Sequence, residues 1–262
     1  MRAPIFQVDA FTTQRFAGNP AAVIVLPEFL DDAVMQAIAA ENNLAETAFL
    51  VADNGDYRLR WFTPLLEVPL CGHATLASAA VVMERLQPER QQVLFHSASG
   101  PLAVQKTPSG YAMDFPRRIA QRVAAPPADL IDALGLAPLE IYADRFNYLA
   151  LLDNAQQVRE LKPNLALIAT LDRSGVAVTA AGDGVYDFVS RYFAPAKGIP
   201  EDPVTGGAHC ALAPFWAQRL NKTVFHAYQA SRRGGELHCR LAGERVVLEG
   251  ACVFYLSGEI EI

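Results

Sequence analysis

The sequence predicts an α+β fold of two pseudo-symmetric halves, each a strongly bent, mostly antiparallel, barrel-like sheet around a central helix. Three observations predict it: a motif that recurs at half the chain length, strand runs separated by turn residues, and a helix of small residues after each copy of the motif. A self-similar chain usually folds each copy into the same supersecondary unit. For a chain of 262 residues, two domains of roughly 100–150 residues are the natural expectation.

The repeated motif lies at an offset of 131 residues, which is half of the 262-residue chain. Residues 60–64 read RWFTP, and residues 191–195 read RYFAP. The second copy then carries three extra residues, so that Cys71-Gly72-His73 stands opposite Thr205-Gly206-Gly207. Strand, proline turn, glycine turn and apolar helix follow in the same order in both copies, which favours duplication over chance.

Strands and helices are predicted from apolar periodicity and from the turn residues that bound each run. Helices are expected at 31–42, where Asp begins a stretch with apolar residues at helical spacing, and just after the proline pair at 126–127. The small-residue segments ATLASAAVVMERL and AHCALAPFWAQRL predict the two central helices, because Ala and Ser let strands approach closely. The predicted strands are 4–11, 20–26, 46–52, 57–63, 92–96, 101–106, 110–115, 146–152, 175–180, 185–193, 235–241, 245–248 and 251–256.

Charge and composition exclude several classes of function. The formal net charge is −6 and the basic residues are dispersed, which suits nucleic acid poorly because that affinity comes from neutralised phosphates. No stretch supplies the roughly 18 apolar residues of a membrane helix, and the N-terminus lacks the apolar core of a secretion signal. Four scattered cysteines without C-x-x-C spacing indicate a reducing compartment. We therefore expect a cytoplasmic protein that binds neither nucleic acid nor membranes.

No cofactor and no metal are expected from the motifs. The sequence lacks G-x-G-x-x-G and Walker-type loops. His209, His226 and His238 do not combine with carboxylates or thiols at a recognised ligand spacing. The adjacent pairs His209-Cys210 and His238-Cys239 leave a metal site open as an alternative.

The two glycine turns are candidates for anion binding. A helix that begins directly after a turn directs free backbone N–H groups and the positive end of its dipole at whatever lies before it. Gly72 and the pair Gly206-Gly207 stand at equivalent places in the two halves. They can hold a substrate carboxylate or the charge that develops during proton transfer. The alternative is that these glycines only permit tight packing at a turn.

Three ionisable residues near these turns are candidates for acid–base chemistry. Glu46 enters a strand in an apolar neighbourhood, where desolvation is expected to raise its pKa and to let it take and return a proton. His73 lies in the first turn of a central helix and can hydrogen-bond to a substrate. Asp202, held between two prolines, can orient His73 or the substrate. Each has a structural alternative: solvent exposure or capping for Glu46, packing for His73, and a turn for Asp202.

Four blocks of the sequence resemble the PhzF (phenazine biosynthesis) family, which shares its fold with diaminopimelate epimerase. They read VDAFTTQRFAGNPAAVIVL, NLAETAFL, RWFTPLLEVPLCGHATLASA and RYFAPAKGIPEDPVTGGA, in that order along essentially the whole chain. The resemblance implies a diaminopimelate epimerase-like fold with the active site in the cleft between its halves. We expect one half to span 1–117, joined by 252–262, and the other to span 118–251.

The resemblance also implies roles for particular residues. Glu46 is expected to shuttle the proton, with His73 and Asp202 beside it. Substrate contacts are expected from Asn19, Gly72, Gly206 and Gly207. The family activity is a cofactor-independent isomerisation by proton relocation in a small, cyclic carboxylate-bearing molecule, and the family commonly forms homodimers. At Gly207 the family often has Ser, so a hydroxyl contact to the substrate can be missing here.

Two other functions are weighed against this isomerase. Related racemases use one cysteine from each half, but here Cys71 stands opposite Thr205, whose hydroxyl is too weak an acid to replace a thiol without an adjacent base. Cys210 lies more than a helical turn further on and is expected in the core. A racemase that uses Cys71 is therefore a weaker alternative. A non-catalytic small-molecule binding protein that retains the cleft is the other.

Overall fold

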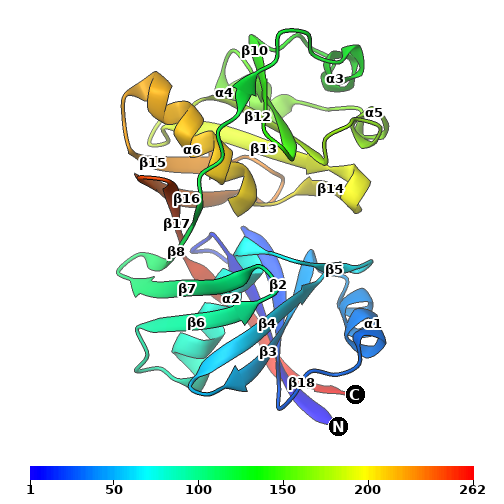
Figure 1. The fold of residues 1–262 in the computed structure, drawn as a ribbon, viewed down its shortest axis with the longest axis vertical. Helices are drawn as coiled ribbons and strands as arrows, with labels where there is room; N and C mark the ends of the chain where they lie inside the picture. Colours follow the sequence, from blue (N-terminus) through cyan, green and yellow to red (C-terminus); the bar gives the residue numbers. More distant parts are fainter. The chain divides into compact units, whose positions relative to one another are not determined.

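A computed structural model describes residues 1–262 and divides them into two compact units. Unit 1 comprises Met1–Asp114 and Glu249–Ile262, and unit 2 comprises Phe115–Leu248. The boundaries expected from the sequence lie three residues later in both places. None of the helices has both the length and the apolar character needed to cross a membrane. Figure 1 shows the helices and strands of the chain.

Unit 1 is built on a single bent sheet. Its strands run in the order β18-β1-β2-β3-β4-β6-β7-β8, and only the pairs β2–β3 and β4–β6 are parallel. The short β5 pairs with β4 on the same unit. The bounds are β1 (Arg2–Ala10), β2 (Asn19–Leu26), β3 (Glu46–Asp53), β4 (Asp56–Phe62), β5 (Glu67–Val68), β6 (Gln92–Ser97), β7 (Gly100–Thr107), β8 (Gly110–Pro116) and β18 (Cys252–Glu261).

Unit 2 repeats this pattern of strand pairing. Its strands run in the order β9-β10-β11-β12-β13-β15-β16, and only β11–β12 and β13–β15 are parallel. The short β14 pairs with β13 as β5 pairs with β4. The bounds are β9 (Gln121–Arg122), β10 (Glu140–Ala143), β11 (Asn147–Leu151), β12 (Gly175–Ala181), β13 (Phe188–Ala194), β14 (Ile199–Asp202), β15 (Val224–Gln229), β16 (Gly235–Ala242) and β17 (Arg245–Gly250).

Each unit has one buried central helix made of small residues. In unit 1 this is α2 (Gly72–Val81), which is buried from His73 onward and packs against β1, β2, β3 and β18. A single turn of π-helix at Val82–Leu86 ends it. In unit 2 the central helix is α6 (Gly206–Leu220), which is longer and accommodates Pro214. The alanines leave room for strands to come close, as the sequence predicts.

The remaining helices lie on the outer sides of the sheets (Figure 1). In unit 1, α1 (Asp32–Asn42) connects the parallel strands β2 and β3. In unit 2, α4 (Ala155–Glu160) and α5 (Leu165–Ala169) make the equivalent connection, and α3 (Ala128–Leu134) precedes β10. A parallel pair needs such a crossover, because its strands cannot be joined by a hairpin.

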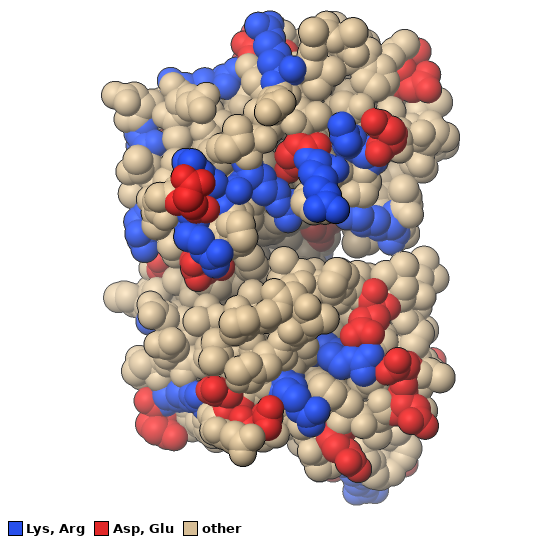
Figure 2. Space-filling model, in the orientation of Figure 1, with Lys and Arg blue, Asp and Glu red and all other residues tan.

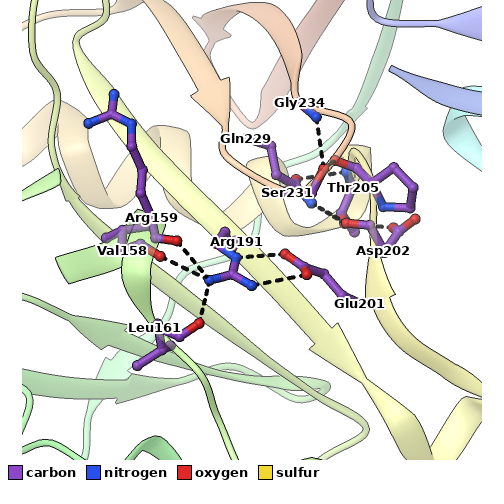
Figure 3. Close-up of polar contacts among 11 residues, drawn as sticks. Val158, Arg159, Leu161, Arg191, Glu201, Asp202, Thr205, Gln229, Ser231 and Gly234 are labelled. Atoms are coloured by element: carbon purple, nitrogen blue, oxygen red, sulfur yellow. Dashed lines mark hydrogen bonds and ion pairs between the residues drawn. The ribbon is translucent and has the colours of Figure 1, made fainter. Parts of the chain in front are cut away.

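The arginine of the repeated motif makes the same ion pair in both units. In unit 1, Arg60 donates to Glu67 in a bidentate pair with distances of 2.7 and 2.6 Å. In unit 2, Arg191 donates in the same way to Glu201, at 2.6 and 3.0 Å (Figure 3). Glu67 and Glu201 are equivalent once the three extra residues of the second copy are counted. The sequence repeat thus corresponds to a repeat of side-chain contacts.

The predicted elements differ from the structure in a few places. The sequence reading omits the strands β5, β9, β10, β14 and β15 and the helices α4 and α5. It also ends the last strand at residue 256, whereas β18 continues to Glu261. β15 reads VFHAYQ, in which buried Phe225, Ala227 and Gln229 alternate with the less buried Val224, His226 and Tyr228. Gln229 lies on the buried face, so the apolar alternation that identifies a strand is incomplete there.

Candidate active site

Glu46 and His73 meet inside unit 1. Glu46 is the first residue of β3, and the parallel register places it beside Ala21 of β2. His73 is the second residue of α2. The His73 Nε2 and Glu46 Oε2 atoms lie 3.2 Å apart, and the two residues are only 5% and 7% exposed. The first residue of a strand and the second residue of a helix thus place a carboxylate against an imidazole in a buried environment.

His73 has two further polar neighbours on its other ring nitrogen. The Asn19 Nδ2 atom lies 3.1 Å from His73 Nδ1, and the Cys71 Sγ atom lies 3.5 Å from the same nitrogen. Burial lowers the pKa of His73 to about 3, while a hydrogen bond with the Pro20 backbone acts in the opposite direction. His73 is therefore a neutral imidazole near pH 7, which can hydrogen-bond but carries no charge.

Asn19, a predicted substrate-binding residue, lies in the interior of unit 1. Its side chain is fully buried, and its amide contacts His73. The expectation of a direct contact between Asn19 and substrate stays a prediction. The observed contact instead fits a residue that orients the imidazole.

The donor set of this cluster can in principle bind a metal ion. One ligand atom from each of Glu46, Cys71 and His73 lies within 4.8 Å of the other two. However, Cys71 approaches His73 Nδ1, whereas Glu46 approaches Nε2. A metal ion binds an imidazole through one ring nitrogen, so ligands gathered at both nitrogens do not surround a single ion. The arrangement therefore fits a chain of proton donors and acceptors better than a metal site.

Asp202 is held by a hydrogen-bond network in unit 2 (Figure 3). The Thr205 hydroxyl donates to Asp202 Oδ2 at 2.6 Å. Gln229, which is fully buried, accepts from the Thr205 backbone N–H at 2.8 Å. Its amide donates to the Asp202 carbonyl at 2.7 Å and to the Thr205 hydroxyl at 3.1 Å. The side chains of Asp202, Thr205 and Gln229 thus hold the turn that precedes α6.

Neither central helix has a side-chain cap at its N-terminus. Cys71 and Thr205 are the residues before the first turns of α2 and α6, and neither side chain accepts a hydrogen bond from that turn. The backbone N–H groups that begin at Gly72 and Gly206 therefore lack the usual capping partner. Such helix ends attract anions.

Arg118 is a cation beside the glycine turn of unit 2 that the sequence reading missed. A Cβ on Gly207 would lie 3.8 Å from Arg118 Nη1 and Nη2, so the guanidinium is next to the helix entry. The ring of Phe146 supports it from 4.6 Å. The pKa of Lys197 is lowered, first by burial and then by the charge of Arg118, so both cations lie in this region. In the sequence Arg118 stands out only as part of the pair Arg117-Arg118, and nothing in that pair predicts that it lies near Gly207.

Elsewhere the charges are mixed. On the face drawn in Figure 2, Lys and Arg side chains are interspersed with Asp and Glu side chains. All four cysteines are free thiols, and Cys210 lies in the core as expected.

Comparison with known proteins assigns the chain to a family. The sequence matches the family described as phenazine biosynthesis-like protein (PhzC-PhzF) over residues 8–258. The chain belongs to this family. An uncharacterized isomerase from Halalkalibacterium halodurans is 48% identical over 262 residues, which is 99% of each chain. A PhzF-family protein from Enterococcus faecalis matches with a TM-score of 0.96 at 45% identity, over 100% of both chains.

The comparisons also confirm the fold class and the class of enzyme. A hydroxyproline epimerase from Agrobacterium vitis matches with a TM-score of 0.64 over 99% of this chain and 92% of that one. At 13% identity this likeness concerns the fold alone. The predicted α+β, diaminopimelate epimerase-like fold is therefore confirmed. Within the PhzC-PhzF family, this chain is an enzyme of the isomerase class.

Proposed function

We propose that the chain is a cofactor-independent isomerase that relocates a proton within a small carboxylate-bearing substrate, with Glu46 as the group that takes and returns the proton. The observation that carries the proposal is the 3.2 Å approach of Glu46 Oε2 to His73 Nε2 in a dry environment. A buried carboxylate beside a polar neighbour is suited to taking and returning a proton.

The proposed reaction has two proton transfers and no net redox change. The Glu46 carboxylate takes a proton from a substrate carbon, the C–H bond breaks, and its electron pair moves into the conjugated system of the substrate. The resulting carboxylic acid then gives the proton to a different carbon of the same molecule, which restores the carboxylate. One residue can serve both steps because substrate and product differ only in where this hydrogen is bonded.

His73 is proposed to assist Glu46 without changing charge. A neutral imidazole can hold the carboxyl group in one orientation in both of its protonation states. A protonated imidazole at 3.2 Å would instead favour the carboxylate form and make Glu46 a weaker base. The lowered pKa of His73, which follows from its burial, supports the neutral form. Asn19 is proposed to position this ring through its contact with Nδ1.

The residues of unit 2 are proposed to bind and orient the substrate. An uncapped N-terminus of α6, with Gly206 and Gly207 at its start, offers backbone N–H donors to an anion. Arg118 adds a positive charge at the same turn. Asp202, held by Thr205, is proposed to orient a donor group of the substrate. This charge arrangement favours a substrate that bears a carboxylate.

The proposal is tested by exchange of carbon-bound hydrogen with solvent. A panel of cyclic amino- and hydroxy-carboxylates is incubated in deuterated water with wild type, Glu46→Gln and, as a matched control, Glu41→Gln from the exposed side of α1. We expect deuterium incorporation in wild type and in the control, and a loss of about 10²–10⁴-fold in Glu46→Gln. Full exchange in Glu46→Gln would remove Glu46 from this role.

A racemase that uses Cys71 remains the second candidate, because the thiol lies 3.5 Å from His73 Nδ1. Thr205, the residue equivalent to Cys71, lies beside the Asp202 carboxylate. The Thr205 hydroxyl donates to Asp202 and accepts from Gln229. A carboxylate is far too weak a base to ionise a hydroxyl near neutral pH. Loss of exchange in Cys71→Ala with folding preserved would favour thiol chemistry. A binding protein without activity would instead retain ligand affinity in Glu46→Gln and exchange no hydrogen in any variant.

A further inference from the structure

Two histidines face each other across a hairpin on the surface of unit 2. In the antiparallel pair β15–β16, His226 stands directly opposite His238. Their rings stack with centroids 4.4 Å apart and planes 16° apart. Residues on either side in both strands, such as Phe225 and Leu237, are buried, so the two histidines lie on the outer face of the sheet.

A carboxylate completes this cluster. The Glu236 Oε2 atom lies 3.1 Å from His226 Nε2. The other carboxylate oxygen, Oε1, accepts a hydrogen bond from the Tyr186 hydroxyl at 2.8 Å. The Tyr186 ring also packs against His226, with centroids 4.8 Å apart. Glu236 is thus held in place beside the imidazole.

These distances suit a shared metal ion. Two ligand atoms that each bond one ion at about 2.0–2.1 Å lie roughly 3 Å apart in tetrahedral or square geometry. The 3.1 Å separation of His226 Nε2 and Glu236 Oε2 meets this requirement. His238 is exposed and can turn about its side-chain bonds to direct a nitrogen at the same point. Imidazole and carboxylate together suit Cu²⁺, Ni²⁺ and Zn²⁺.

The fold does not itself require histidines at these positions. In unit 1 the equivalent hairpin is β6–β7, where the third residue of the first strand pairs with the fourth of the second, as His226 pairs with His238. That pair is Leu94 opposite Ala103. The two imidazoles are therefore a feature of unit 2 alone and do not follow from the duplicated scaffold.

We propose that His226, His238 and Glu236 form a surface site for one divalent transition-metal ion, with Cu²⁺ bound most tightly. Tyr186 acts as the outer partner that orients Glu236. The bound ion would link β15 to β16 and stabilise unit 2. This site is separate from the Glu46 cluster and does not depend on the function proposed for that cluster.

The proposal is tested by titrating untagged, metal-free protein with CuSO₄ and following binding by calorimetry and electron paramagnetic resonance. Wild type is compared with His226→Ala, His238→Ala, Glu236→Gln and a matched control, His96→Ala. His96 is an exposed strand histidine 3.6 Å from Asp56, without a second imidazole across the hairpin. Cys71→Ser controls for binding at the buried cluster of unit 1.

We expect one tightly bound Cu²⁺ per chain, with hyperfine coupling to two imidazole nitrogens. Loss of either histidine should weaken binding by about tenfold or more, since even outer partners of a metal contribute at least that much. Glu236→Gln should also weaken it by about tenfold, because an amide oxygen is a poorer ligand than a carboxylate. His96→Ala and Cys71→Ser should leave it unchanged. Added Cu²⁺ should raise the Tm of wild type and not of His238→Ala. Wild-type affinity in both histidine variants, or loss of binding in Cys71→Ser, would overturn the proposal.

Discussion

Units 1 and 2 share a scaffold but differ in the polar groups placed on it. Both pair their strands in the same pattern, and both hold the arginine of the repeated motif against an equivalent glutamate. At the helix entry, however, unit 1 carries Cys71 and His73 against Glu46, whereas unit 2 carries Thr205 bonded to Asp202 and Gln229. Duplication therefore preserved the contacts that hold the fold while the helix entries diverged. This difference underlies our proposal that Glu46 of unit 1 transfers the proton and that residues of unit 2 bind the substrate.

The largest expected difference in stability concerns the two repeated arginines. Arg191 is 11% exposed and also donates to the carbonyls of Val158, Arg159 and Leu161, whereas Arg60 is 25% exposed and pairs with the exposed Asp32. Arg191→Ala should cost about 3 kcal/mol or more, because it leaves a half-buried carboxylate and three carbonyls without their donor. Arg60→Ala should cost about 1 kcal/mol.

Each unit contains one tryptophan, so the unfolding of each unit can be followed separately by fluorescence. Trp61 lies in unit 1 and Trp216 in unit 2. Urea unfolding followed by fluorescence in a Trp61→Phe background reports unit 2, and a Trp216→Phe background reports unit 1. Equal losses for the two arginine variants would contradict the difference in burial.

A second comparison concerns pH, because each central helix buries a histidine. Burial lowers the pKa of His73 to about 3 and that of His209 to about 4. An unfolded histidine has a pKa of about 6.5. Below that pH the unfolded chain therefore binds more protons than the folded chain, in which both histidines stay neutral. Stability from these groups is full above about pH 6.5 and falls as the pH drops towards their folded values. Urea midpoints measured between pH 7.5 and 4.5 should fall less steeply in His209→Asn than in wild type. An unchanged slope would mean that His209 is not the group involved.

A smaller effect is expected at the two residues that precede the central helices. Thr205→Val removes a hydroxyl that donates to Asp202 and accepts from the buried Gln229, which should cost about 1–3 kcal/mol. Cys71→Ala removes the thiol that lies 3.5 Å from His73 Nδ1, a weaker contact than a bond between a hydroxyl and a carboxylate, and should cost less. Thermal unfolding of both variants measures this, and a larger loss for Cys71→Ala would assign the thiol a structural role.

The smallest effect is expected for Gly207→Ser, which restores the residue that the family often has. A Cβ there makes only ordinary contact with Arg118 at 3.8 Å, so the stability should change by about 0.5 kcal/mol or less. Gly18→Ser in unit 1 is the contrasting variant, because its Cβ would lie 2.2 Å from the Ala10 carbonyl oxygen and its φ is +64°. A severe loss in Gly207→Ser, measured by thermal unfolding, would mean that the helix entry cannot accept a side chain.

Much of the fold could be predicted because the repeat fixes which segments are equivalent. The proximity of Glu46 and His73 could be predicted from the sequence, because each lies at the start of a strand or helix and both belong to blocks that resemble the family. Gln229 and Arg118 were not found, because Gln229 lies 24 residues from Thr205 and Arg118 lies 89 residues from Gly207, and only the folded sheet brings them together. The pair His226–His238 was not predicted either, because only the register of β15 and β16 places the two histidines opposite each other. The expected cytoplasmic location and homodimer stay predictions.

The proposed roles of Glu46 and Asp202 are tested most directly by comparing Glu46→Gln with Asp202→Asn on the same substrate, once the exchange panel has identified a substrate. Both changes replace a buried carboxylate by an amide of nearly the same shape. We predict that Glu46→Gln lowers kcat by about 10²–10⁴-fold with little change in KM. Asp202→Asn should instead mainly raise KM. If Asp202→Asn abolishes kcat while Glu46→Gln retains it, proton transfer belongs to unit 2 and the account is wrong.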